Sequence, residues 1–297
     1  HRRILGRVQE GNDLNTILRE NGVTTGLFTL NQRLPGSLAR TFSSRLDLRE
    51  TGEGGDTAAL HRELDAWLYV RRNEPFVLYL NTDEPRGTGA LGRGYLGVYE
   101  RQRILGERLK KTADSYDARL SEMDYWIGQL VALLEKHKLL AETAIIITGS
   151  VGSRLKGLAD HKQGFAGFTD QLHVPLVLWH PTAKKTARKR RLKGGDLVDI
   201  APTILGLMGR RGAERMAGRN LLPEMTQNVA QLVRPSAGRV NGRLVGRFGE
   251  WLLRTGGSGP SDLFWLDDEG RGWSRPIKKY PITIRGLRDI LGVSQDP

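Results

Sequence analysis

The sequence has no cysteine among its 297 residues, which excludes a fold held together by disulfides but does not distinguish the cytosol from the periplasm. It also has no run of about 18 apolar residues, so nothing in it would cross a bilayer as a helix. The hydrophobic content of 38% and the charged content of 27% are those of an ordinary globular protein. A chain of this length can bury a large core, which favours one large domain or two lobes.

Acidic residues are too few to balance the basic ones: 33 Asp and Glu face 46 Lys and Arg, for a formal net charge of +13. Seven cations fall within ten residues, namely Lys184, Lys185, Arg188, Lys189, Arg190, Arg191 and Lys193. Such a block can attract an acidic polymer. No aromatic residues interleave it and no nucleic-acid module accompanies it, so we favour a solvated surface loop and do not expect nucleic acid as a partner.

Apolar strands alternate with helical patterns along most of the chain. Strands are predicted at residues 26–30, 76–80, 144–148 and 174–179, and apolar residues at steps of three and four predict a long helix around residues 116–134. A further helix is predicted over residues 197–205, where Pro202 is tolerated because it falls in the first turn. This order predicts an α/β fold, with a mostly parallel central sheet and helices on both faces.

The pattern changes near residue 233. Apolar and polar residues alternate over 239–247 and turn residues follow at short intervals, which is typical of antiparallel strands. We therefore predict two domains, a larger α/β domain over 1–230 and a small antiparallel sheet over 231–297. The final helix, at 284–291, is expected to pack back on the larger domain. Four aromatic residues are expected to pack the small sheet rather than stack on a sugar: Trp251, Phe264, Trp265 and Trp273.

Several segments resemble the sulfatase branch of the alkaline phosphatase superfamily. The helix opening Tyr116-Asp117-Ala118, the strand and turn over 144–152, the strand after His173 and the Leu197–Thr203 helix occur in the family's order and spacing. Weaker similarity extends upstream over 15–28 and downstream to 217–222 and 262–267. The resemblance implies an alkaline phosphatase/sulfatase-like fold and covers almost the whole chain.

The sequence departs from the family at the positions that would bind metal. The family motif Thr-Ser-Asp-His-Gly supplies two ligands to a divalent cation, and this chain has Thr148-Gly149-Ser150-Val151-Gly152 there. Ser150 and Val151 are thus degenerate positions in what we expect to be a buried crevice. Arg86 stands in a loop where relatives often carry a histidine, and an arginine cannot ligate a metal.

The resemblance places the family's nucleophile motif before residue 1, and the chain has no cysteine that could be converted into the sulfatase nucleophile. His161 and Lys162 lie close to where relatives contact the anionic substrate, which makes them candidates for binding an anion, although a polar loop without a role is the alternative. His173 is expected to be a satisfied structural histidine. We assign no function to His61 or His137.

Two interpretations remain open. The first is a catalytically inactive sulfatase-like protein, without cofactor or metal, that acts as a binding or structural subunit for a protein partner or a larger envelope assembly. The second is a metal-dependent sulfatase or phosphotransferase-type hydrolase with its nucleophile upstream of residue 1. It would need calcium or zinc, bound by unfamiliar ligands such as Asp83, Glu84, Asp160 and His161. The resemblance implies a periplasmic or extracellular location, with membrane association only through a segment upstream of this chain.

Overall fold

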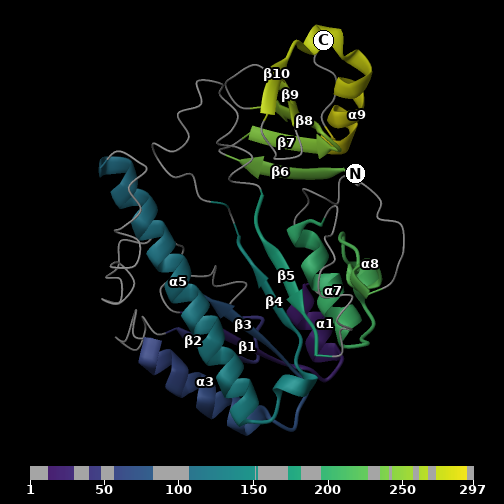
Figure 1. Ribbon diagram of the computed structural model, residues 1–297. Helices are drawn as coiled ribbons and strands as arrows, with labels where there is room; N and C mark the ends of the chain where they lie inside the picture. Colours follow the sequence, from purple (N-terminus) through teal and green to yellow (C-terminus); the bar gives the residue numbers. More distant parts are fainter. Residues whose placement is uncertain are drawn as a thin grey trace.

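The computed structural model describes residues 13–29, 40–47, 57–82, 107–150, 152, 173–181, 195–226, 235–240, 243–256, 261–266 and 272–292. These residues form an α/β body and, above it in Figure 1, a small sheet that carries the C-terminal helix. The predicted α/β class is therefore confirmed, including the small antiparallel sheet.

A parallel three-stranded sheet lies in the body. Its strands are β1 (Thr24–Thr29), β2 (Ser44–Asp47) and β3 (Phe76–Asn81), in the order β2-β1-β3. β1 is the central strand, and its last five residues are all buried. Gly26 is required here because a Cβ at this position would come within 2.8 Å of the Trp67 ring, which closes over β1.

Helices cover both faces of this sheet, as predicted. On one face, α3 (Thr57–Arg71) and α5 (Glu107–Lys136) bury Leu64, Leu68, Leu133 and Leu134 around Phe28 of β1. On the other face, α1 (Leu14–Glu20) and α7 (Ile200–Leu207) contribute the second core cluster of the body. In Figure 1 the first pair of helices lies to the left of the strands and the second pair to the right.

The strands predicted at 144–148 and 174–179 form, but not as members of the parallel sheet. β4 (Ile145–Thr148) and β5 (Leu176–Trp179) pair antiparallel with each other, with Thr148 opposite Leu176, in a separate two-stranded sheet. The expectation of one parallel sheet containing all four strands is thus wrong. A continuous apolar run is compatible with a parallel or an antiparallel neighbour, so the apolar runs at 144–148 and 174–179 did not define the direction of pairing.

The C-terminal sheet is a five-stranded antiparallel meander. It comprises β6 (Ser236–Val240), β7 (Arg243–Phe248), β8 (Trp251–Thr255), β9 (Asp262–Leu266) and β10 (Gly272–Arg275), in spatial order β10-β9-β8-β7-β6. Gly249, at φ 58°, supplies the left-handed backbone of the tight turn between β7 and β8.

The last helix, α9 (Pro281–Leu291), packs on this small sheet. Ile284, Leu287 and Leu291 form one cluster with Leu253 of β8 and Leu263 of β9. The expectation that this helix packs back on the larger domain is wrong, because its apolar stripe is already buried against the strands that precede it.

Short helices complete the described chain: α8 (Leu222–Thr226) and four 3₁₀ segments, η1 (Leu140–Glu142), η3 (Leu197–Asp199), η4 (Ala213–Arg215) and η5 (Ile277–Lys279). None of the helices in the described ranges is both long enough and apolar enough to cross a membrane. The proposed boundary at residue 230 lies outside the described residues and stays a prediction.

Candidate functional site

The carboxyl ends of the three parallel strands bring three polar residues into one row. Thr29 at the end of β1 is in register with Asp47 at the end of β2 and with Asn81 at the end of β3. Residues in register point to the same face of a sheet, so the row presents a carboxylate, a hydroxyl and an amide side by side. Ligands of open α/β sheets bind at this edge, which makes the row the candidate site.

The middle of the row is deeply buried. Thr29 is 3% exposed and its hydroxyl oxygen has no hydrogen-bond partner, while Asp47 is 9% exposed. A buried hydroxyl without a partner costs free energy, so it is a group that a bound polar ligand or a water molecule would satisfy. The sequence offered no signal for this row, because the register that assembles it is not visible before the strands are paired.

The end of β4 carries no charged side chain. Thr148 and Ser150 are both exposed, and the Cβ that Gly149 lacks would sit 3.5 Å from Val174, in ordinary contact. The expectation of a buried crevice at Ser150 is therefore wrong.

The described side chains at this edge are too few to hold a divalent cation by themselves. Calcium and magnesium sites in proteins are built from several carboxylate and carbonyl oxygens, and zinc sites from imidazole or thiolate. The row supplies one carboxylate, Asp47, and the end of β4 supplies only hydroxyl groups. Among the residues with described positions, no group of three or more His, Cys, Asp or Glu side chains could hold a metal ion.

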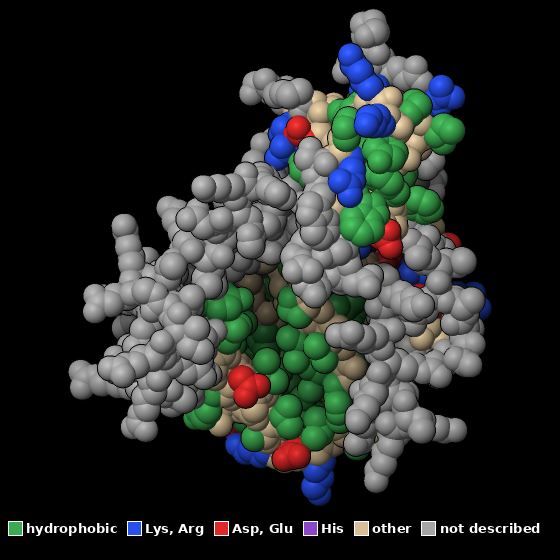
Figure 2. Space-filling model, turned by 45° about the horizontal axis from the view of Figure 1, so that its top comes forward, with side chains coloured by type: hydrophobic (Ala, Val, Ile, Leu, Met, Phe, Trp, Pro, Cys, Tyr) green, Lys and Arg blue, Asp and Glu red, His purple; other side chains and the backbone are tan. Residues whose placement is uncertain are grey.

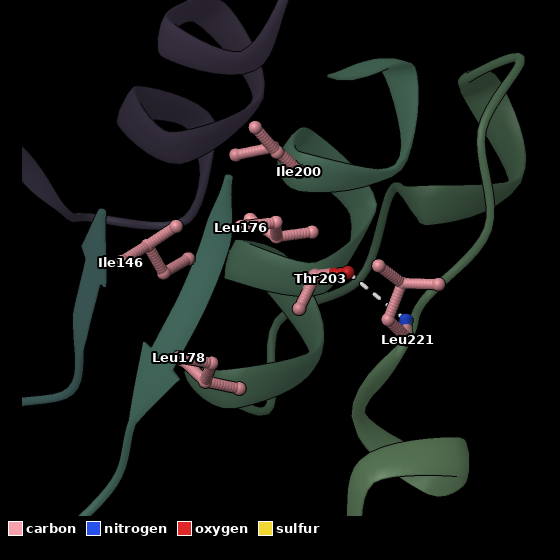
Figure 3. A pocket seen from close by; sticks show the side chains of 6 residues that line it. All are labelled: Ile146, Leu176, Leu178, Ile200, Thr203 and Leu221. Carbon is pink, nitrogen blue, oxygen red and sulfur yellow. Dashed lines mark hydrogen bonds between the residues drawn. The ribbon is translucent and has the colours of Figure 1, made fainter. Parts of the chain in front are cut away.

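A small cavity lies between the β4–β5 pair and α7 (Figure 3). It is lined by Ile146, Leu176, Leu178, Ile200, Thr203 and Leu221 and encloses about 10 Å³, room for about one water molecule. Its one polar side chain is already engaged: the Thr203 hydroxyl donates to the carbonyl of Asp199 (2.6 Å) and accepts from the backbone N–H of Leu221 (2.9 Å). The cavity therefore belongs to the packing of α7.

A buried ionic network secures the start of α7. The Asp199 carboxylate, 6% exposed, accepts from the backbone N–H groups of Asp196 (3.0 Å) and Arg219 (2.8 Å). The Arg219 side chain also pairs with Glu224 of α8. Burial, and then the neighbouring Asp199, raise the pKa of Asp196 above its usual range. The residues of this network belong to or lie near the segments at 197–203 and 217–222, which resemble the sulfatase family. The network holds the start of α7 to the chain that leads into α8.

A second charged cluster joins the two helices on the opposite face. Asp65 of α3 accepts from Lys136 Nζ (2.7 Å) and lies 2.7 Å from His137 Nε2. The hydrogen bond from Lys136, and then that from His137, lower the pKa of Asp65 below its usual range. The cluster lies away from the strand ends, so it ties α3 to α5 rather than forming a site. The pairing leaves no pattern in the sequence, because Asp65 and His137 are 72 residues apart.

Several predicted residues lie outside the described part of the chain. These are Val151, His161, Lys162, Asp83, Glu84, Arg86, Asp160 and the basic run Lys184, Lys185, Arg188, Lys189, Arg190, Arg191 and Lys193. They stay predictions. His173 is described and is exposed, and its expected structural role stays a prediction.

The predicted packing of the C-terminal aromatic residues is confirmed where their side chains are described. Trp251 contacts Tyr280 with ring centroids 4.8 Å apart, and Phe264 is 5% exposed beneath the guanidinium of Arg254. Trp265 donates its indole N–H to Glu250 at 2.9 Å. Trp273 lies opposite Trp265 in the ladder.

Comparison with known proteins identifies relatives of the α/β body. The sulfatase family model matches residues 7–210. Arylsulfatase K of Gallus gallus is 25% identical over 204 residues, which are 62% of this chain and 37% of the relative. Steryl-sulfatase of Mus musculus is 26% identical over 196 residues, 59% of this chain and 28% of the relative. The chain thus spans only about a third of the length of these curated relatives.

The fold similarity extends further than the sequence similarity. The crystal structure of Ps i-CgsB in complex with k-i-k-neocarrahexaose has a TM-score of 0.70 at 16% identity, covering 98% of this chain and 76% of that one. A Vibrio parahaemolyticus protein described as belonging to the alkaline phosphatase superfamily has a TM-score of 0.67 at 14% identity, with 97% and 69% covered. At these identities the structures establish the fold alone.

Proposed function

Because this chain belongs to the sulfatase family, we propose that it keeps the family fold as a binding or structural subunit and does not hydrolyse sulfate or phosphate esters. The observation that carries the proposal is the end of β4. An exposed Ser150 stands there, where the family resemblance implies a metal-binding carboxylate.

The chemical reason is the loss of charge stabilisation. Ester hydrolysis of this kind uses a divalent cation to polarise the ester and to activate the nucleophile, which supplies much of the barrier reduction. Asp47 is the one carboxylate of the polar row, and a single carboxylate neutralises only half the charge of such a cation. The row can instead hydrogen-bond a polar group, with Thr29 as the oxygen that lacks a partner.

We propose a protein partner, within a larger assembly of a cell envelope, and a periplasmic or extracellular location. The net charge of +13 also favours contact with acidic surfaces or polymers. The basic run at 184–193 is the proposed site of that contact, as a solvated loop.

The test is turnover of an aryl sulfate and an aryl phosphate by purified protein, with calcium, zinc or manganese added and then removed by a chelator. A variant with both Asp83→Asn and Asp160→Asn, purified in parallel, is the matched control, because it removes two of the alternative ligands while both preparations carry the same contaminating hydrolases. We expect equal, background turnover in both. Chelator-sensitive turnover in the parent protein that the double variant lacks would overturn the proposal and support the metal-dependent hydrolase.

A further inference from the structure

The segment that leads into and through the last helix is strongly basic. Between residues 272 and 288 it has five cations and no Asp or Glu, and the cations are Arg275, Lys278, Lys279, Arg285 and Arg288. The first acidic residue after them is Asp289, near the end of α9. Figure 2 brings this end of the molecule forward and shows Lys and Arg side chains lying among hydrophobic ones there.

The packing of the neighbouring apolar residues turns two of these cations outward. Ile277 and Tyr280 pack against the core cluster that contains Ile284. Lys278 and Lys279 lie between these two anchors in the chain and are both exposed. The two ammonium groups therefore extend from a segment whose backbone is held against the small sheet.

An exposed isoleucine follows the two lysines. Ile282 is 85% exposed, more than any other large hydrophobic residue in the described ranges. The buried stripe of α9 consists of Ile284, Leu287 and Leu291. At 100° per residue, Ile282 and Arg285 lie on the other side of the helix, and both are exposed. A single exposed isoleucine is common, but this one stands within four residues of three cations.

These cations are not neutralised by acidic neighbours. In the part of the chain that the structure describes, no ion pair involves Lys278, Lys279 or Arg285. In the same small sheet Arg243 and Arg254 both pair with Asp262. The positive charge at the start of α9 is thus available to an external anionic surface.

We propose that the surface formed by Lys278, Lys279, Ile282 and Arg285, here called the α9 patch, binds a membrane that contains anionic lipids. Cations are attracted to the anionic headgroups, and an exposed aliphatic side chain gains free energy by entering the acyl boundary beneath them. A nucleic acid carries the same negative charge, but its phosphate backbone offers an isoleucine no apolar environment. The combination of charge and exposed aliphatic side chain therefore favours a lipid surface.

The contact is peripheral. Leu287 and the rest of the apolar stripe of α9 are already buried against β8 and β9, so the helix does not sink into the bilayer as a whole. The inference goes beyond the proposed function, which names a protein partner, and places a membrane contact within this chain itself. It does not depend on the absence of catalysis, so ester turnover would contradict the proposed function and leave the α9 patch intact.

Co-flotation of the full chain with lipid vesicles tests the charge. Vesicles of phosphatidylcholine alone are compared with vesicles of equal parts phosphatidylcholine and phosphatidylglycerol. We expect binding to the second kind only, and we expect it to weaken as the salt concentration rises. Lys278→Glu with Lys279→Glu should weaken the binding at least about tenfold. The matched control, Arg210→Glu with Arg211→Glu, reverses another adjacent and exposed pair and should change the binding less than about twofold.

A second pair of variants tests the apolar part. Ile282→Ser should weaken binding to the anionic vesicles about threefold or more, whereas Val70→Ser, at a 65% exposed residue of α3, should not. Equal binding to both kinds of vesicle, no binding to either, or full binding after charge reversal at 278 and 279 would overturn the inference. Unchanged binding of Ile282→Ser would also overturn it, because the patch would then bind any acidic polymer, nucleic acid included, and not a membrane.

Discussion

The C-terminal sheet and the α/β body differ in how their described strands pair and in how deeply those strands are buried. In the C-terminal sheet five strands pair consecutively, and one helix covers a face whose leucines are almost fully buried, with Leu253 and Leu263 both at 0% exposure. In the body the strands divide into two sheets between shared helix layers, and the residues of β4 are at best half-buried. Among the described residues, the C-terminal strands thus form one hydrogen-bonded sheet, whereas the strands of the body form two.

The match to the sulfatase family and the similarity of fold cover different parts of the chain. The sulfatase family match ends at residue 210, before the C-terminal sheet begins at Ser236, yet the fold similarity covers 98% of the chain. The part that the family model recognises is thus the α/β body, which holds the polar row of Thr29, Asp47 and Asn81. This is the region where function must be sought.

The largest expected effect is a difference in the free energy of unfolding between variants of the C-terminal sheet and of the body. Leu253→Ala in β8 should lower the free energy of unfolding by about 3 kcal/mol, because it leaves a cavity in a closed core. Ile147→Ala in β4 should cost only about 1 kcal/mol, because that side chain is only partly buried. Urea unfolding followed by tryptophan fluorescence measures both. Equal losses would show that β4 is as enclosed as β8 and would break the contrast.

A second prediction concerns how the body is held around α7. Gly218→Ala should cost about 2 kcal/mol, because its Cβ would come within 2.0 Å of the carbonyl oxygen of Val198 and backbone would have to shift. Gly128→Ala in α5 is the control: no atom lies within 4 Å of its Cβ, and alanine favours a helix, so this variant should be neutral or stabilising. Thermal unfolding of the two variants side by side decides between them. A Gly218→Ala protein as stable as the parent would contradict the close approach.

A third prediction addresses the degenerate β4 end. We expect the double variant Ser150→Asp, Val151→His to remain inactive, since two ligands without their counterparts do not build a cation site. Because Ser150 is exposed, the new carboxylate stays hydrated and the stability change should remain within about 1 kcal/mol. Calorimetric titration with calcium and with zinc measures the binding. Micromolar affinity for one ion, with a raised unfolding temperature, would mean that the other ligands are already present.

The smallest effect concerns the contact between α3 and α5. The lowered pKa of Asp65 means that its ionised form is favoured by folding, so its contribution is present above the ordinary value of 3.8 and is lost as the pH falls through the lowered folded value. Asp65→Asn should therefore cost about 0.5 kcal/mol at neutral pH, as is usual for partly exposed pairs, and less as the pH falls below 3.8. Urea unfolding midpoints of the parent protein and of Asp65→Asn, measured from neutral pH to below 3.8, test whether the difference in stability shrinks on acidification. A difference that grows on acidification would contradict it.

Much of the fold could be predicted from apolar patterns. The ranges predicted for β1, β3, β4 and β5 agree with the observed strands to within about two residues, because continuous apolar runs bounded by turn residues define strands well. The pairing of β4 with β5 could not be predicted in the same way, since an apolar run does not encode the direction of its neighbour.

The polar row of Thr29, Asp47 and Asn81 was harder to predict, because its residues come together only when the strands pair in the observed register. Thr29 and Asp47 meet only when β1 and β2 pair in their observed register, and neither residue belongs to a recognisable motif. Ser150 could be identified as a departure from the family, but its exposure depends on how much structure surrounds β4. The Asp199 network likewise needs segments 20 residues apart to pack together.

The central claim is that this sulfatase-family chain lacks a working cation site, and metal content tests it most directly. Plasma mass spectrometry on protein purified without chelator, after dialysis against calcium, zinc and manganese together, should find each metal far below one ion per chain. Ser150→Ala protein treated identically should retain the same residual amounts. Near-stoichiometric calcium, zinc or manganese in the parent protein would contradict the account and restore the metal-dependent hydrolase as the better explanation.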